Sequence, residues 1–189
     1  MMKKFESFLK NKKAKYKVVS HRKVYTAWDS SATQHINIKT VAKTLLVKAD
    51  NDYFFVVLSA NKKLDINKLK KIINVWRVKE AKTLDNIRTA TTKASAFAKA
   101  SADRQKLLKA QKIKKISLCS ENIVKKKIVG KEGAMAPFGS FYGYKTFVDS
   151  LLLKQKKINL NAGSFTESLE MTPANYKKVE EPIVGSFGK

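Results

Sequence analysis

The spacing of apolar residues along the chain predicts short helices interspersed with strands. Phe5, Phe8 and Leu9 recur at helical spacing, which predicts an amphipathic helix over 2–11. Two runs rich in β-branched and aromatic residues, 41–48 and 53–60, flank the segment A-D-N-D and predict a hairpin turning at 50–52. Further strands are expected at 16–20, 113–118, 144–149 and 157–161, and further helices at 26–35, after Asp65, at 122–127 and after Thr172. This mixture predicts a mixed α/β fold, one domain over 1–189 with a mixed sheet flanked by helices.

Glycine and proline are concentrated in the last third of the chain. All seven Gly and all three Pro lie between Gly130 and Gly188, and the densest cluster is G-K-E-G-A-M-A-P-F-G-S-F-Y-G at 130–143. Glycine allows backbone angles and close approaches that other residues forbid, and proline fixes φ. The cluster therefore predicts an irregular, well-defined loop, which we expect to form the floor of the functional site.

The composition of the chain says more about its binding partners than about its fold. The 189 residues carry 40 Lys+Arg against 15 Asp+Glu, a net charge of +25, which favours nucleic acid, an anionic membrane surface or an acidic protein as partner. No apolar run is long enough to span a membrane, and residues 1–10 lack the apolar stretch of a secretory signal. The single cysteine, Cys119, excludes an internal disulfide and disfavours a metal cluster. We expect a cytoplasmic protein that binds anions and needs no metal or cofactor.

One segment, 86–115, differs from the rest in composition. It holds seven Ala, nine Lys+Arg and one acidic residue, and repeats K-A-S-A at 93–96 and 99–102. Alanine and lysine favour helix, but the apolar stripe is thin, so the segment is predicted to be a basic helical arm or a partly disordered insertion at about 86–112. It either binds nucleic acid or is a solvated insert without a role. In the first case the binding residues are Lys93, Lys99, Arg104 and Lys106.

Few residues are obvious candidates for catalysis. The chain has no G-x-S-x-G, no phosphate-binding loop and no metal-spaced His/Cys set. His21, His35 and Cys119 are expected to have ordinary structural roles. Lys43 differs, because it lies in the apolar strand V-A-K-T-L-L-V on the face of Val41, Leu45 and Val47. A partly buried ammonium needs a partner or an anionic or carbonyl ligand, so a functional and a structural role are both open.

The order of several short motifs resembles the YbaK / prolyl-tRNA-synthetase-associated domain family. V-A-K-T-L-L-V, the hairpin, K-K-L-D-I-N-K-L-K-K, G-A-M-A-P-F-G, F-V-D-S-L-L and N-A-G-S follow one another over about 2–80 and 113–175. The lysine of K-T-L and the G-x-x-x-P loop, the family's specific marks, are present as Lys43 and as 133–137. The basic insertion is not typical of the family.

The resemblance implies a hydrolase that deacylates mischarged aminoacyl-tRNA, typically proline tRNA carrying alanine or cysteine. It implies that Lys43 and Gly133 are catalytic, with Lys43 holding the terminal adenosine phosphate or the carbonyl and the Gly133 backbone polarising the ester. The implied substrate pocket consists of Thr26, Ala134, Met135, Ala136, Pro137, Phe138, Asn161 and Gly163. The implied partners are aminoacyl-tRNA and prolyl-tRNA synthetase. Two alternatives stay open at this point: a non-catalytic tRNA- or rRNA-binding or synthetase-associated module with the same fold, and a small basic ribosome-associated protein.

Overall fold

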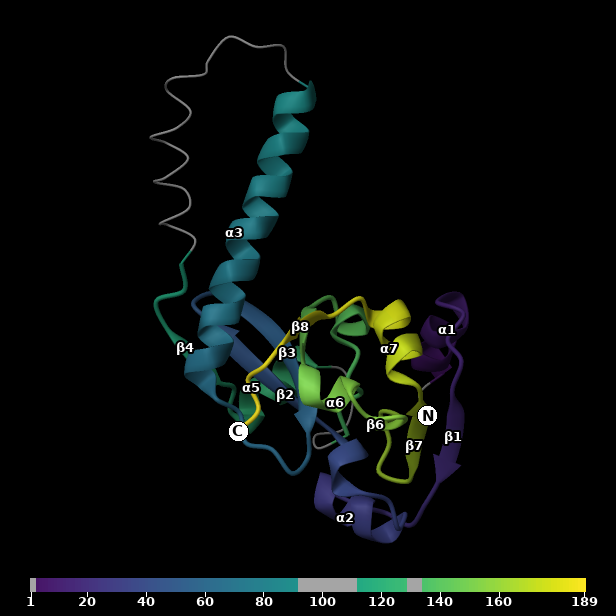
Figure 1. The fold of residues 1–189 in the computed structure, drawn as a ribbon. Coiled ribbons are helices and arrows are strands. Elements are labelled where there is room, and N and C mark those ends of the chain that lie inside the picture. The colour runs from purple at the N-terminus through teal and green to yellow at the C-terminus, as the bar shows by residue number, and fades with distance from the viewer. Residues whose placement is uncertain (1–2, 92–111, 129–133) are drawn as a thin grey trace.

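A five-stranded mixed sheet forms the centre of the molecule (Figure 1). The computed structural model describes residues 3–91, 112–128 and 134–189, with side chains left out for 84–91. The strand order is β4-β2-β3-β5-β8; β2 pairs antiparallel with β3 and β4, and β5 pairs parallel with β3 and β8. The strands are β2 (Ala42–Ala49), β3 (Asp52–Ser59), β4 (Ile116–Leu118), β5 (Lys145–Asp149) and β8 (Ile183–Gly185).

A second, three-stranded sheet is antiparallel throughout and has the order β1-β7-β6. Its strands are β1 (Lys17–Ser20), β6 (Ile158–Asn161) and β7 (Glu167–Met171). The two sheets meet where Val41, directly before β2, forms a parallel bridge with Asn159 of β6. This seam brings the start of the central hairpin beside the small sheet.

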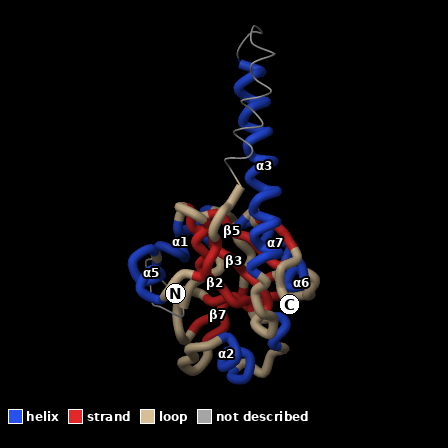
Figure 2. The backbone as a smooth tube through the Cα atoms, turned by 90° about the vertical axis from the view of Figure 1, so that its left-hand side faces the viewer, coloured by secondary structure: helices blue, strands red, loops and turns tan. Residues whose placement is uncertain are grey.

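The helices flank both sheets (Figures 1 and 2). Their bounds are α1 (Lys3–Asn11), α2 (Ala27–Thr33), α3 (Ile66–Thr91), α5 (Glu121–Lys127), α6 (Ser150–Leu153) and α7 (Pro173–Glu180), with short 3₁₀ turns η1 (Ile38–Thr40) and η2 (Gly139–Tyr142). Thr26 caps α2 through a capping box with Asp29, and Thr172 caps α7. In both figures α2 lies at the end of the body opposite the tip of α3.

Helix α3 leaves the body as a long arm (Figure 2). Its 26 residues correspond to roughly 39 Å at 1.5 Å per residue. Its first turns are fixed to the core, where Leu69 and Ile73 are fully buried and Ile72 packs against β8. A Cβ at Gly185 would lie 2.6 Å from Ile72 Cδ1, so a larger residue there would require the Ile72 side chain to move. The helix thus continues into the predicted insertion, of which 92–111 lie outside the described residues.

The core is built on both faces of strand β3. Val56, Val57 and Leu58 are fully buried, and neighbouring residues point to opposite faces of the sheet. Val57 packs in the cluster that contains Phe5 of α1 and Tyr176 of α7, whereas Val56 and Leu58 pack with the residues of α3. A strand buried on both faces explains the continuous apolar run at 53–60.

The sequence predicted most elements to within a few residues and missed others. The predicted strands at 16–20, 144–149 and 157–161 and the predicted helix at 122–127 are present, while the strand predicted at 113–118 is shorter, 116–118. Strands β7 and β8 were not predicted. Glu167, Ser168 and Glu170 interrupt the apolar pattern of β7, and β8 has three residues, too few for a periodicity.

A buried carboxylate, Asp149, ties the end of β5 to the C-terminal segment. Its Oδ2 accepts hydrogen bonds from the backbone N–H groups of Phe187 (2.8 Å) and Gly188 (2.7 Å), and its Oδ1 accepts one from Leu151 (2.9 Å). The side chain therefore caps α6 and holds the segment after β8 at the same time.

Replacing Asp149 by Ala should destabilise the fold strongly. Three backbone N–H groups would be left without their acceptor, and each such group costs about 1–3 kcal/mol when it stays buried. We expect a decrease of about 3 kcal/mol or more in the free energy of unfolding, measured by urea denaturation. Asp65→Ala, which removes an exposed cap of α3, is the matched control and should cost much less. Equal decreases in the two variants would contradict this role of Asp149.

Candidate functional site

A cavity of about 310 Å³ lies at the seam between the two sheets. Its wall is formed by the loop after β1, helix α2, the start of β2, one residue of the glycine–proline loop, and strands β6 and β7. The lining residues are His21, Val24, Tyr25, Thr26, Ala27, Trp28, Ser30, Val41, Ala42, Lys43, Thr44, Ala60, Met135, Asn159, Asn161 and Ser168. Four predicted site residues meet here from distant parts of the chain: Thr26, Lys43, Met135 and Asn161.

Lys43 is half-buried in this wall and is held by backbone carbonyls. Its Nζ donates a hydrogen bond to the carbonyl of Lys62 (2.6 Å) and lies 3.5 Å from that of Ala60. Burial lowers the pKa of Lys43, because desolvation disfavours the ammonium form. A partly desolvated cation fixed by neutral carbonyls keeps its charge available to an anionic or carbonyl ligand.

A chain of hydrogen-bonded polar side chains forms part of the same wall. His21 Nε2 is 2.9 Å from Ser168 Oγ, and His21 Nδ1 is 2.8 Å from the carbonyl of Arg22. Gln34 Nε2 donates to Ser30 (2.7 Å) and Ser168 (3.2 Å), and Asn159 Nδ2 donates to Gln34 Oε1 (3.0 Å). Sequence reasoning missed this network. The one signal for it in the sequence was Asn159, a polar residue between Ile158 and Leu160 in the predicted strand.

Two aromatic rings stand at the rim of the cavity. Tyr25 is 60% exposed and Trp28 is 64% exposed, although both line the cavity. Thr26, between them, uses its hydroxyl to cap α2, because Oγ1 accepts from the backbone N–H of Asp29. Exposed rings beside a polar cavity are suited to stacking against a planar group such as a nucleobase.

In the described part of the glycine–proline loop, one residue lines the cavity and the others are buried in the core. Met135 reaches the cavity, but Ala134, Ala136, Pro137 and Phe138 are buried and do not line it. Phe138 packs against the rings of Phe5, Phe8 and Tyr176, and the Tyr176 hydroxyl donates to the carbonyl of Pro137 (2.6 Å). These residues therefore anchor the loop. Gly133, the predicted catalytic glycine, lies outside the described residues.

The end of this loop is fixed by a close backbone approach and a buried carboxylate. A Cβ at Gly139 would lie 2.5 Å from Thr146 Oγ1 and 2.8 Å from the carbonyl of Tyr144, so only glycine fits. Glu180 accepts hydrogen bonds from Thr146 and from the hydroxyl of Ser140. Burial raises the pKa of Glu180, and these hydrogen bonds oppose the shift.

The predicted turn after β6 contributes one residue to the cavity. Asn161 Oδ1 accepts from the backbone N–H groups of Gly163 (2.7 Å) and Ser164 (3.2 Å), and Asn161 lines the wall. Gly163 has a φ of 74° and shapes the turn without lining the cavity.

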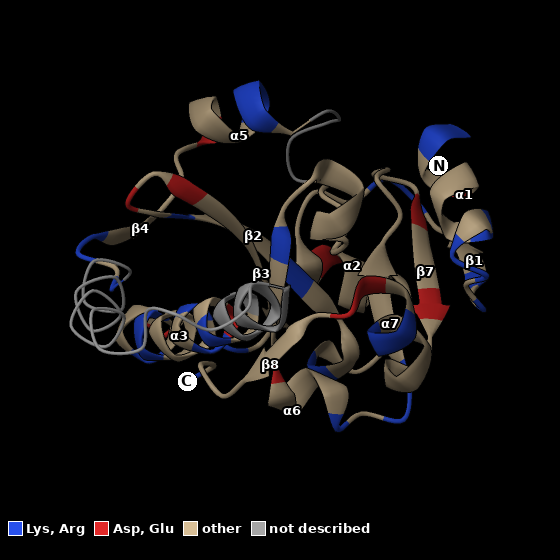
Figure 3. Ribbon diagram, turned by 90° about the horizontal axis from the view of Figure 1, so that it is seen from above, with Lys and Arg blue, Asp and Glu red and all other residues tan. Residues whose placement is uncertain are grey.

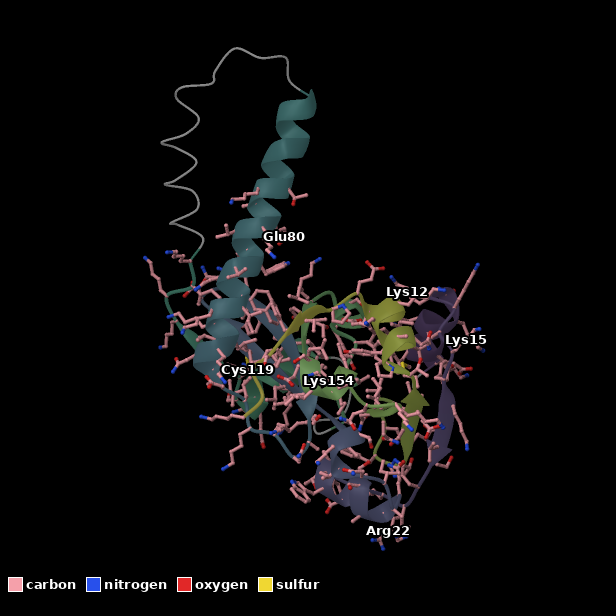
Figure 4. All side chains as sticks on the ribbon, viewed as in Figure 1. Lys12, Lys15, Arg22, Glu80, Cys119 and Lys154 are labelled. Atoms are coloured by element: carbon pink, nitrogen blue, oxygen red, sulfur yellow. The ribbon has the colours of Figure 1, made fainter. Side chains whose placement is uncertain are left out.

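Basic residues are distributed over several elements. Figure 3 shows Lys and Arg on α1, α3, α5 and α7, and Figure 4 places Arg22 near α2 and Glu80 on the arm. The predicted tRNA-binding residues Lys93, Lys99, Arg104 and Lys106 lie outside the described residues. Within the described part of the chain no group of three or more His, Cys, Asp or Glu could hold a metal ion. No helix there is long and apolar enough to cross a membrane.

A larger hollow of about 680 Å³ lies between the hairpin turn and α3, lined by Trp76, Arg77 and Tyr144 among others. None of the site residues predicted from the sequence lines it. The smaller cavity is the better candidate because it combines Lys43 with a polar network and exposed rings.

Several solved structures share the fold of this chain at low sequence identity. The hypothetical protein APE2540 is 18% identical and matches with a TM-score of 0.71, over 99% of this chain and 100% of that one. A proposed trans-editing enzyme for prolyl-tRNA synthetase is 12% identical and matches with a TM-score of 0.70, over 100% and 99%. The chain also spans 31% of a proposed signal transduction protein from Marinobacter aquaeolei VT8, at 14% identity and a TM-score of 0.59.

Comparison with curated proteins gives no match. The family model of the aminoacyl-tRNA editing domain matches residues 21–94 and 87–179, which include every residue that lines the cavity. The chain therefore belongs to the aminoacyl-tRNA editing domain family.

Proposed function

We propose that this protein is an aminoacyl-tRNA deacylase that hydrolyses the ester of a mischarged tRNA in the cavity at the sheet seam. The observation that supports this most is Lys43, a partly desolvated ammonium at the wall of a polar cavity in a chain of the editing family. An aminoacyl ester is already activated, so its hydrolysis needs a placed water and charge stabilisation more than a strong nucleophile.

The size of the cavity favours a small substrate group. About 310 Å³ is at the lower end of ligand pockets, which run from about 300 to 1,000 Å³. We propose that it takes a small amino acid with the attached ribose, while the terminal base stacks on Tyr25 or Trp28. Alanine and cysteine on proline tRNA are the first substrates to test, with serine as the third.

Lys43 would act on the phosphate or carbonyl of the acceptor end. Its Nζ is already oriented by the Lys62 carbonyl, so little reorganisation is needed when a ligand oxygen approaches. Backbone N–H groups around Gly133 would hold the developing oxyanion. The net charge of +25 would bind the tRNA backbone without reading its sequence.

The alternative function is a tRNA-binding module, free or synthetase-associated, that does not hydrolyse the ester. It predicts tight binding of tRNA with no turnover. Deacylation assays on proline tRNA charged with alanine, cysteine or serine distinguish the two functions directly.

Lys43→Ala should lower deacylation at least a hundredfold. Removal of one preorganised electrostatic group in a site of this kind costs about 3 kcal/mol in the barrier. The fold should persist, because the folded state already disfavours the Lys43 charge; urea denaturation checks this. Lys48→Ala, on the same strand beside Tyr53, is the matched control and should keep normal turnover. Normal turnover of Lys43→Ala would remove Lys43 from the mechanism.

Gly133→Val should reduce turnover by about a hundredfold if the loop backbone holds the oxyanion. A branched side chain adds bulk and restricts the backbone angles open to glycine. Single-turnover rates at saturating tRNA measure the effect, and binding of uncharged tRNA serves as the control. A near-normal rate would mean that this glycine has only a structural role.

Removing positive charges from the insertion should weaken tRNA binding and leave the rate of ester hydrolysis unchanged. The salt slope of binding falls by about 0.7–0.9 for every phosphate that the protein no longer neutralises. The variant replaces four residues by Gln: Lys93, Lys99, Arg104 and Lys106. Its matched control replaces four exposed residues in α1, in β1 and in the segment between them by Gln: Lys4, Lys12, Lys15 and Lys17.

The two quadruple variants remove the same charge, so general attraction changes equally. We expect a flatter salt dependence for the insertion variant than for its control, with equal rates at saturating tRNA. Identical affinities and salt slopes would identify the insertion as a passive segment.

A further inference from the structure

For a neutral His21 ring, the hydrogen bonds around Ser168 have one consistent direction. The carbonyl of Arg22 can only accept, so His21 Nδ1 carries the proton that it donates over 2.8 Å. In the neutral ring Nε2 is then an acceptor, and the Ser168 hydroxyl, 2.9 Å away, is the donor. The serine proton therefore points at an imidazole nitrogen that is ready to receive it.

The remaining contacts of Ser168 hold its oxygen in place. Gln34 Nε2 donates to Oγ (3.2 Å), and Gln34 is itself oriented by Asn159, which donates to its Oε1 (3.0 Å). A hydroxyl oxygen has two lone pairs, and Gln34 occupies one. Ser168 is only 3% exposed but lines the cavity, so its second lone pair can accept only from a group inside the cavity.

This arrangement has the features of an activated hydroxyl. The hydroxyl and its base are within hydrogen-bond reach, and a third group, the Arg22 carbonyl, orients the base. His21 and Ser168 are 147 residues apart in the chain, so the loop after β1 and strand β7 bring them together. Lys43 and Thr44 line the same cavity.

We propose that Ser168 is a catalytic residue that relays a proton from the attacking water to His21. The proposal rests on the proposed function, hydrolysis of an aminoacyl ester. The water oxygen bonds to the ester carbonyl carbon while one water proton passes to Ser168 Oγ and the serine proton passes to His21 Nε2. The carbon–oxygen bond to the ribose then breaks, and its electron pair leaves with the ribose oxygen. That oxygen recovers the proton from His21 by the same path, which yields a free amino acid and a free ribose hydroxyl.

Single-turnover and steady-state deacylation of four variants tests the relay: Ser168→Ala, Ser168→Thr, His21→Ala and the double variant His21→Ala/Ser168→Ala. A positioned proton acceptor contributes about 10²–10⁴ in rate. We expect Ser168→Ala and His21→Ala each to lower kcat about a hundredfold with KM changed less than about threefold. Ser168→Thr keeps the hydroxyl and should stay within about tenfold of wild type.

The double variant separates a relay from two independent effects. When two groups act as one unit, the effects of removing them on the rate are not additive. The rate of the double variant should therefore lie within a few-fold of the rate of the slower single variant. Rates are measured well below each variant's unfolding midpoint, because unpaired buried groups reduce stability. His35→Asn, which changes the other histidine of the chain, is the control and should be fully active.

Three outcomes would overturn the relay: full turnover of Ser168→Ala, multiplicative effects in the double variant, or an acylated Ser168 trapped by rapid quenching and mass spectrometry. A wild-type protein that deacylates none of the charged tRNAs would instead defeat the proposed function. If the wild-type protein is active and Lys43→Ala is inactive, the proposed function stands. A fully active Ser168→Ala would then contradict only the relay.

Nitrogen NMR of the histidine rings tests the geometry without any substrate. The chain has two histidines, and His35→Asn assigns their signals. We expect neutral His21 as the Nδ1–H tautomer, with Nε2 unprotonated, and a shifted Nε2 signal in Ser168→Ala. A neutral Nε2–H tautomer would contradict the proposed direction of the hydrogen bonds.

Discussion

The seam between the two sheets is the constraint on which the site depends. Val41 pairs with Asn159 there, so the start of β2, which carries Lys43, is fixed against β6 and through it against β7. Neither sheet alone forms a closed wall: β2 supplies the cation, and the small sheet supplies Asn159, Asn161 and Ser168. Helix α2 and the segment before it line another side and add the exposed rings of Trp28 and Tyr25. The cavity is therefore a product of how the sheets join, and a change in that junction would alter every wall at once.

Local patterns predicted local structure well. The hairpin, the helix that begins at Thr26 and the helix after Thr172 were predicted, because the residues that decide them are neighbours in the chain. Lys43 stood out for the same reason, as a charge inside an apolar strand. The pairing of His21 with Ser168 could not be predicted, because it depends on β1 and β7 being adjacent. Ala136 and Phe138 were expected in the pocket, but apolar residues of a loop can face either a cavity or the core, and here the ring cluster around Phe5 takes them.

The site combines one charge with a wall of neutral polar groups, and the two are stabilised differently. Hydrogen bonds among Asn159, Gln34, Ser168 and His21 offset much of the cost of burying these groups. Lys43 is paired with carbonyl oxygens instead of a carboxylate, which leaves its charge uncompensated, and burial lowers its pKa. A carboxylate partner would stabilise the lysine more and would repel an anionic substrate. Weak compensation of this charge therefore fits a group that attracts phosphate or a developing oxyanion.

The pairing of β1 with β7 has a consequence for the order in which the protein is synthesised. Residues 17–20 find their strand partner only at 167–170, and Phe5 and Leu9 of α1 pack with Tyr176 of α7. Roughly 150 residues must be translated in between, which takes about 7–30 s at about 5–20 residues per second. The N-terminal segment thus lacks its packing partners until the C-terminal segment has been synthesised. During that interval only transient contacts or chaperones shield its apolar side chains from water. A nascent chain stalled before residue 167 would expose α1 and leave the seam cavity without its Ser168 wall, so ribosome-bound intermediates should bind chaperones more strongly than the released protein.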